Sequence, residues 1–123
     1  MPKRLTDEER AFRAVTERQL QTRVIDAARV YGWHVAHFHD SRRPVKPGVF
    51  VGDRDAAGFP DLVLCRTGEL VFAELKRETG VVTALQQTWL DALEAAGAEV
   101  HVVRPSSEAE FVRRVARGRF VQR

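Results

Sequence analysis

The chain has 123 residues, 44% of them hydrophobic, and a formal net charge of +3. This is the size of one ordinary globular domain, so we expect a single domain over residues 1–123. No stretch approaches the roughly 20 apolar residues of a membrane span, and we expect a soluble protein without a membrane partner. The one cysteine, Cys65, lacks a partner for an internal disulfide, which indicates a cytoplasmic location.

The basic residues are unevenly placed along the chain. Arg42, Arg43 and Lys46 crowd one segment, and residues 113–123 form an arginine-rich tail. Guanidinium groups bind phosphate through paired donors, so these clusters favour a nucleic-acid partner. An ordinary solvated surface explains the composition equally well.

The N-terminal third has the spacing of helices followed by a strand. Thr6 with Glu9 and Thr16 with Gln19 match capping boxes, and apolar residues recur at helical intervals up to Tyr31. Residues 1–15 therefore form a helical extension. Residues 33–38 are expected to form a strand, and the Gly- and Pro-rich segment 40–58 is expected to be a long loop.

Two apolar runs, 61–66 and 69–76, follow this segment and are separated only by Thr67 and Gly68. This pattern predicts a β-hairpin with a two-residue turn. Both strands are apolar on both faces over most of their length, so the hairpin is expected to lie inside a covered sheet.

The rest of the chain predicts a helix, a strand and a second helix. Thr83 with Gln86 begins a helix that ends near Ala96, and residues 98–103 form a strand. Ser107 and a glutamate three residues later have the spacing of a capping box for the last helix. The order of elements predicts an α/β domain with a mixed central sheet flanked by helices.

The hairpin places two acidic residues opposite each other. If Arg66 pairs with Glu69 across the turn, stepping outward brings Asp61 opposite Glu74, with Cβ atoms roughly 5 Å apart. Two like charges at this distance repel each other and need a counter-charge. Mg²⁺ or Mn²⁺ would supply one, because these ions prefer carboxylate and carbonyl oxygens.

Lys76 lies two residues beyond Glu74 and therefore on the same face of the strand. Two acids and an amine around a divalent ion are suited to phosphodiester hydrolysis, in which the amine orients a water molecule or stabilises charge on phosphorus. An isolated Glu-x-Lys triplet at an exposed strand end would not indicate a catalytic site. The register-matched hairpin and the Pro60-Asp61 pair favour the catalytic interpretation.

These residues resemble the signature of the PD-(D/E)xK nuclease superfamily, and residues 58–105 are similar to the stand-alone VRR-NUC domains of phages and bacteria nearly throughout. The resemblance implies a restriction-endonuclease-like core and a location in a bacterial or phage-infected cell. It implies that Asp61, Glu74 and the Leu75 carbonyl bind the metal and that Lys76 positions or activates the attacking water.

The resemblance also implies roles for Glu17 and Gln86. Glu17 matches the first acidic position of the family and would complete the metal site directly or through water; a solvated helix carboxylate is the alternative. Gln86 matches a glutamine that touches the substrate or Lys76, although it could instead serve only its own helix end. His37 is expected near phosphate, in line with Arg42, Arg43 and Lys46 as DNA-binding residues.

The expected function is a Mg²⁺- or Mn²⁺-dependent endonuclease that hydrolyses DNA phosphodiester bonds. The family resemblance further implies branched or junction DNA as the substrate and a homodimer as the active form. Two alternatives remain open from the sequence: a DNA-binding module that does not cut, and a nuclease subunit of a replication or repair complex.

Overall fold

The computed structural model describes residues 3–38, 44–46, 49–50 and 56–117, with only the main chain at 44–46 and 49–50. Two helices open the chain, α1 (Asp7–Ala14) and α2 (Glu17–Val30). Each begins at a complete capping box, in which the threonine hydroxyl and the side chain three residues later exchange hydrogen bonds with the main chain. The two helix starts predicted at Thr6 and Thr16 are confirmed.

A mixed sheet of four strands forms the centre of the fold, in the order β1-β4-β5-β6. The strands are β1 (His34–His37), β4 (Leu62–Arg66), β5 (Glu69–Leu75) and β6 (Glu99–Val103). The first three run antiparallel to one another, whereas β6 lies parallel to β5. The predicted β4–β5 hairpin is therefore the centre of the sheet, as its apolar strands require.

The prediction of a structureless loop over residues 40–58 is wrong in part. Within it, β2 (Pro44–Lys46) and β3 (Val49–Phe50) pair antiparallel as a small separate sheet. Strands of two or three residues are too short to show an alternating pattern, and β2 also begins with a proline, which explains why the sequence did not reveal them.

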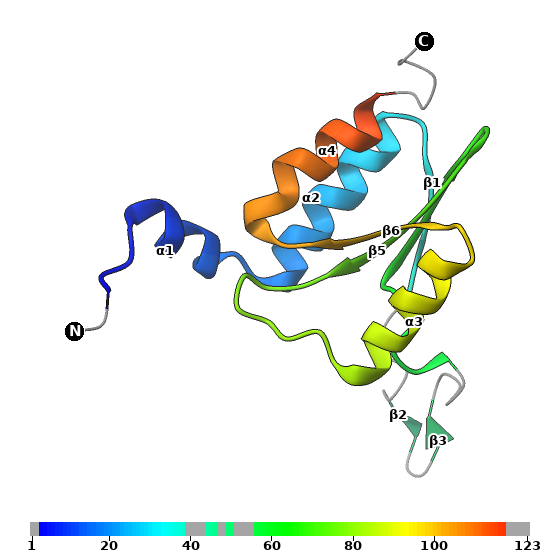
Figure 1. Ribbon diagram of the computed structural model, residues 1–123, viewed down its shortest axis with the longest axis horizontal. Helices are drawn as coiled ribbons and strands as arrows, with labels where there is room; N and C mark the ends of the chain where they lie inside the picture. Colours follow the sequence, from blue (N-terminus) through cyan, green and yellow to red (C-terminus); the bar gives the residue numbers. More distant parts are fainter. Residues whose placement is uncertain (1–2, 39–43, 47–48, 51–55, 118–123) are drawn as a thin grey trace.

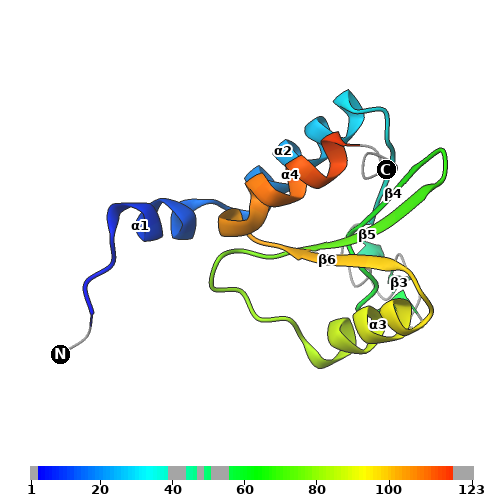
Figure 2. The same cartoon turned by 45° about the horizontal axis from the view of Figure 1, so that its top comes forward.

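Helices cover the two faces of the sheet unequally. Figures 1 and 2 show α2 side by side with α4 (Glu108–Ala116) on one face, and α3 (Ala84–Ala95) on the other. The core lies between the sheet and the α2/α4 layer, and α1 projects away from it. The buried side chains of this core include Leu20, Val24, Ala28, Leu62, Leu64, Val71, Ala73, Val103, Phe111 and Val115. No helix in the described parts of the chain is long and apolar enough to span a membrane.

The last helix begins differently from the prediction. The Ser107 side chain makes no cap to α4; its hydroxyl accepts a hydrogen bond from the Arg104 N–H at 3.0 Å instead. The cause is a short 3-10 turn, Pro105–Ser107, that precedes α4 and changes the direction of the Ser107 side chain. The predicted capping box with Glu110 is therefore wrong, although the helix itself is present.

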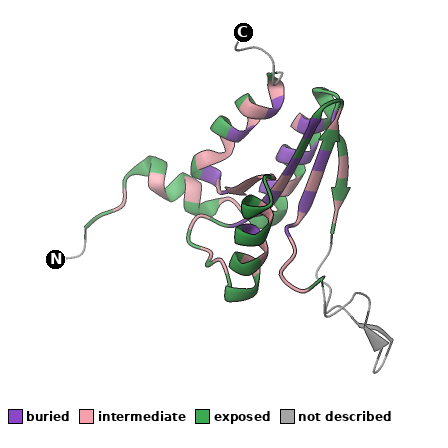
Figure 3. Ribbon diagram, turned by 45° about the vertical axis from the view of Figure 1, so that its right-hand side comes forward, coloured by how far each residue is buried: buried purple, intermediate pink, exposed green. Residues whose placement is uncertain are grey.

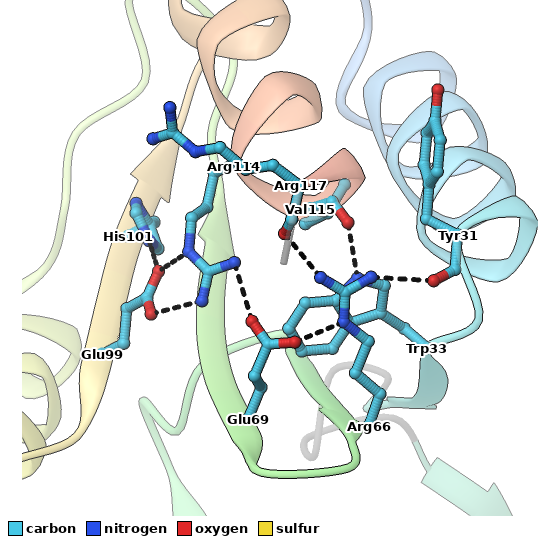
Figure 4. A network of polar contacts seen from close by, with 9 residues as sticks. All are labelled: Tyr31, Trp33, Arg66, Glu69, Glu99, His101, Arg114, Val115 and Arg117. Carbon is cyan, nitrogen blue, oxygen red and sulfur yellow. Dashed lines mark hydrogen bonds and ion pairs between the residues drawn. The ribbon is translucent and has the colours of Figure 1, made fainter. Parts of the chain in front are cut away.

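A network of ion pairs fixes the closed end of the hairpin (Figure 4). Glu69 is buried and accepts hydrogen bonds from Arg66 at 2.5 Å and Arg114 at 3.1 Å. Arg114 also forms a two-pronged pair with Glu99 of β6. The Arg66 guanidinium stacks over the Trp33 ring at 4.3 Å, so the network joins the hairpin to β6 and α4 and to the end of α2.

We expect Glu69→Ala to destabilise the fold strongly, because it leaves two partly buried guanidinium groups without their shared carboxylate. The expected loss in the free energy of unfolding is about 3 kcal/mol. Urea denaturation measures it, with Glu94→Ala on the exposed face of α3 as the matched control. An equal, small effect of the two variants would show that the network does not support the hairpin.

Candidate active site

The hairpin brings Asp61 and Glu74 together at its open end. Its register pairs Arg66 with Glu69 and continues without a break to Leu62 and Ala73. One step further, Asp61 lies just before β4 and Glu74 lies within β5. Gly68 has a φ of +76°, as a tight two-residue turn requires. The structure thus has the hairpin register that the sequence predicts.

Asp61 is held by the main chain of both neighbouring strands. Its Oδ2 accepts a hydrogen bond from the Leu75 N–H at 2.8 Å, and its carbonyl accepts one from the Phe38 N–H at 2.9 Å. Burial raises the pKa of the Asp61 carboxyl above its usual range, although the Leu75 N–H and the charge of Lys76 act in the opposite direction. The carboxylate is therefore fixed in place but incompletely neutralised.

Glu74 is the most constrained acid of the site, with only 2% of its surface exposed. Its Oε2 accepts a hydrogen bond from Gln86 Nε2 at 2.9 Å, whereas Oε1 is buried and has no hydrogen-bond partner among the described residues. Burial, followed by the charge of Asp61, raises the pKa of Glu74 to about 8. A buried carboxylate oxygen without a donor is costly, and it indicates that the site is built for a further positive group.

Gln86 caps its own helix, as one of the two sequence-based interpretations expects, and it also bonds to Glu74. Its Oε1 accepts a hydrogen bond from the Thr83 N–H at 2.9 Å, which completes the capping box of α3. Its Nε2 donates to Glu74 at the same time. The helix cap therefore orients the amide toward Glu74, and a contact of Gln86 with Lys76 or the substrate stays a prediction.

Lys76 follows Glu74 on the same face and points back toward it. The Lys76 Nζ lies 3.6 Å from Glu74 Oε2, and the residue is only 9% exposed. Its N–H donates to the Val103 carbonyl, so the parallel pairing with β6 continues past the end of β5. The ammonium is close to one oxygen of Glu74 and opens on its other side into an adjoining pocket.

Glu17, at the start of α2, faces this pocket from the other side. The pocket is lined by Glu17, Lys76, Arg77, Thr79, Gly80 and Val81. Surrounding protein atoms and then the charge of Asp61 raise the pKa of the Glu17 carboxyl, and Lys76 partly offsets them. Glu17 is therefore near the acid pair, but no group of three His, Cys, Asp or Glu side chains in the described residues is arranged to hold a metal directly.

The structure describes only some of the residues that we expect to bind DNA. His37, at the end of β1, lies near enough to Asp61 for its charge to lower the pKa of that carboxyl. Arg42 and Arg43 lie outside the described residues, as does the side chain of Lys46. The place of the basic cluster relative to the acid pair therefore stays a prediction.

Sequence reasoning missed Arg104, which organises the wall of the pocket. One nitrogen of its guanidinium donates to the carbonyls of Arg77, Glu78 and Gly80 at 2.8, 3.2 and 2.7 Å. This holds the turn directly after Lys76 in place. The parallel register of β6 against β5 brings Arg104 there, and no sequence pattern reveals that register.

Sequence reasoning also missed Gly58, a glycine that positions Gln86. It has a φ of +83°, and a Cβ at this position would lie 2.7 Å from the Leu85 carbonyl carbon and 2.9 Å from the Gln86 nitrogen. Nearby, Trp89 Nε1 donates to the Ala57 carbonyl at 3.1 Å. The first turn of α3 is therefore packed directly against the segment that leads into Asp61.

The donors around the acid pair suit a hard divalent ion. Asp61 and Glu74 supply carboxylate oxygens, one of which has no partner, and no thiolate accompanies them. The Leu75 carbonyl faces the same edge as its N–H, because both groups of one strand residue point to one side. Mg²⁺ is commonly held by one or two carboxylates with water and substrate phosphate completing its shell, so two acids are sufficient.

A mixed four-stranded sheet flanked by helices, with an Asp and a Glu-x-Lys on adjoining strands, is the core of a PD-(D/E)xK-type nuclease. Residues 53–106 match the family model of the VRR-NUC domain, a range that contains the acid pair, Lys76 and Gln86. This segment of the chain is therefore similar to a PD-(D/E)xK-type nuclease domain. Comparisons with curated proteins and with solved structures found no match.

We expect Gly58→Ala to be more harmful than Gly97→Ala, although both glycines have a positive φ. A Cβ at Gly97 meets nothing within 4 Å, so that variant carries only the backbone strain of about 1 kcal/mol. The Gly58 variant must also displace the start of α3, which adds about 2 kcal/mol. Urea denaturation of both variants measures the difference, and equal losses would contradict this packing.

We expect Glu74→Gln to stabilise the metal-free protein increasingly as the pH rises. The folded-state pKa of about 8 exceeds the ordinary value of 4.5, so the contribution of Glu74 to stability is present below about pH 4.5 and is lost as the pH approaches 8. The total loss is on the order of 4 kcal/mol.

The measurement for this prediction is the melting temperature in EDTA between pH 5 and pH 9. The difference between the Glu74→Gln variant and the unmodified protein should grow across this range. Glu94→Gln, on the exposed side of α3, should show no such trend. A constant difference for Glu74→Gln would mean that this carboxyl ionises normally.

Proposed function

We propose that this nuclease domain hydrolyses DNA phosphodiester bonds with the help of Mg²⁺ or Mn²⁺. The observation that carries the proposal is the pair of Asp61 and the buried Glu74, in which one Glu74 oxygen has no donor among the described residues and Lys76 lies 3.6 Å from the other. A purely structural carboxylate at this depth would have its oxygens satisfied. An ion held by Asp61, Glu74 and the Leu75 carbonyl would meet that need.

Each residue of the site then has a separate task in the hydrolysis. A bound divalent ion would supply Lewis acidity to the scissile phosphate and would lower the pKa of water. Gln86 keeps Glu74 in one orientation, and the Leu75 N–H does the same for Asp61. Lys76 would orient the attacking water and stabilise negative charge that develops on the phosphoryl oxygens. Glu17 would act through water at the pocket side.

The substrate we propose is branched or junction DNA, held by its backbone. Arg42, Arg43 and Lys46 would bind phosphates on either side of the cut, with His37 beside Asp61. The sequence offers few side chains suited to base-edge recognition, so structure rather than sequence would govern selectivity. A homodimer would present two such sites to the two strands of a junction.

We expect cleavage of labelled linear, flapped and four-way DNA in Mg²⁺ or Mn²⁺ and none in EDTA. Asp61→Ala and Lys76→Ala should each lower the cleavage rate about 100-fold or more, because each removes a charge on which the transition state depends. The measurement is the single-turnover rate on each DNA, resolved on denaturing gels.

Asp91→Ala and Lys3→Ala are the matched controls, because they remove an exposed acid and an exposed lysine from other parts of the chain. Both should cleave at the rate of the unmodified protein. Full activity of Asp61→Ala, or cleavage that persists in EDTA, would disprove the proposed site. Tight DNA binding without cleavage in either metal would instead indicate a module that does not cut.

A further inference from the structure

Two large apolar side chains are exposed beside the acid pair. Val81 is 78% exposed and Leu85 is 60% exposed, and we call this pair the apolar rim. Single exposed apolar residues are common on protein surfaces and need no explanation. These two differ because Val81 lies in the segment that follows β5, and Leu85 lies in the first turn of α3, next to Gln86.

The apolar rim is placed where a bound substrate must pass. Val81 lines the same pocket as Lys76 and Glu17. Leu85 directly precedes Gln86, whose amide is 2.9 Å from Glu74. The course of this segment from β5 around to α3 is visible in Figure 1, and Figure 3 shows the exposed surface of α3. A phosphate that reaches Lys76 would therefore enter the pocket that Val81 lines, with Leu85 nearby in the first turn of α3.

The segment that carries the apolar rim is held firmly in place at both ends. Arg104 bonds three carbonyls of residues 77–80, and Gly58 packs against the Leu85 main chain. Between them, the capping box of Thr83 and Gln86 fixes the start of α3. Held in this way, Val81 and Leu85 present their apolar side chains to solvent beside the pocket, where a bound ligand would cover them.

We propose that the apolar rim contacts an unstacked base next to the scissile phosphate and thereby selects DNA with an unpaired or frayed nucleotide. This inference rests on the proposed nuclease function. The partner is a nucleic acid because the rim continues from the nuclease site, where Lys76 and the exposed Arg77 supply charge complementary to phosphate. Apolar side chains gain nothing from phosphate, but they contact base faces, which stacking conceals in an intact duplex.

The binding experiment uses a flapped duplex with 2-aminopurine as the first unpaired nucleotide at the branch. Ca²⁺ replaces Mg²⁺, to neutralise the carboxylates while cleavage is avoided. Binding of the unmodified protein should change the fluorescence of the probe. The double variant Val81→Ser with Leu85→Ser should bind this DNA but lose most of the fluorescence change, because the base is no longer covered.

The cleavage experiment compares flapped with fully paired DNA in Mg²⁺. The preference of the double variant for flapped over fully paired DNA should fall about tenfold. One lost contact of ordinary strength changes an affinity by about this factor. Val30→Ser is the matched control, because Val30 is equally exposed at 78% but lies at the end of α2. Val81→Leu keeps an apolar side chain and should retain the preference.

The outcomes separate this inference from the function on which it rests. If the unmodified protein cuts DNA but the double variant keeps its fluorescence change and its flap preference, the inference is wrong and the nuclease function stands. Equal cutting of flapped and paired DNA by the unmodified protein would also show that the inference is wrong while the nuclease function stands. If the unmodified protein neither binds nor cuts any of these DNAs, both are overturned.

Discussion

The repulsion between Asp61 and Glu74 is the constraint around which this domain is arranged. Burial and then the charge of Asp61 raise the pKa of Glu74 to about 8, and burial also raises the pKa of the Asp61 carboxyl. The fold limits this cost with one ammonium, one amide and one main-chain N–H, and it leaves one Glu74 oxygen without a donor. Such incomplete compensation is typical of a functional site, where stability is given up for chemistry.

The two ends of the hairpin are stabilised in opposite ways. At the closed end, the Glu69 carboxylate is fully compensated by two arginines, and hydrogen bonds to them outweigh the effect of burial so that its pKa is lowered. At the open end, neighbouring donors balance the charges of Asp61 and Glu74 only in part. Because a shift of one residue would turn every side chain to the other face, the strong network at the closed end also preserves the pairing of Asp61 with Glu74 at the open end.

The surroundings of the acid pair come from segments that are far apart in the sequence. Arg104 follows the parallel strand β6 and holds the turn after Lys76, whereas Gly58 allows α3 to approach the segment before Asp61. These contacts give Gln86 its position on Glu74, and they keep Val81 exposed at the pocket. The same rigidity that orients the acids therefore also presents an apolar surface to whatever the site binds.

The sequence by itself determined the central hairpin and the acid pair, because strand alternation and a two-residue turn are local rules that fix which residues face each other. It also determined the capped starts of α1, α2 and α3, where the pattern lies within four residues. The sequence did not reveal the short strands β2 and β3. It also did not reveal how α4 begins, because Pro105 redirects Ser107. Only the tertiary structure decided that Glu17, Gln86 and Arg104 meet at the hairpin, because their positions depend on helix packing and on a parallel register that no local pattern encodes.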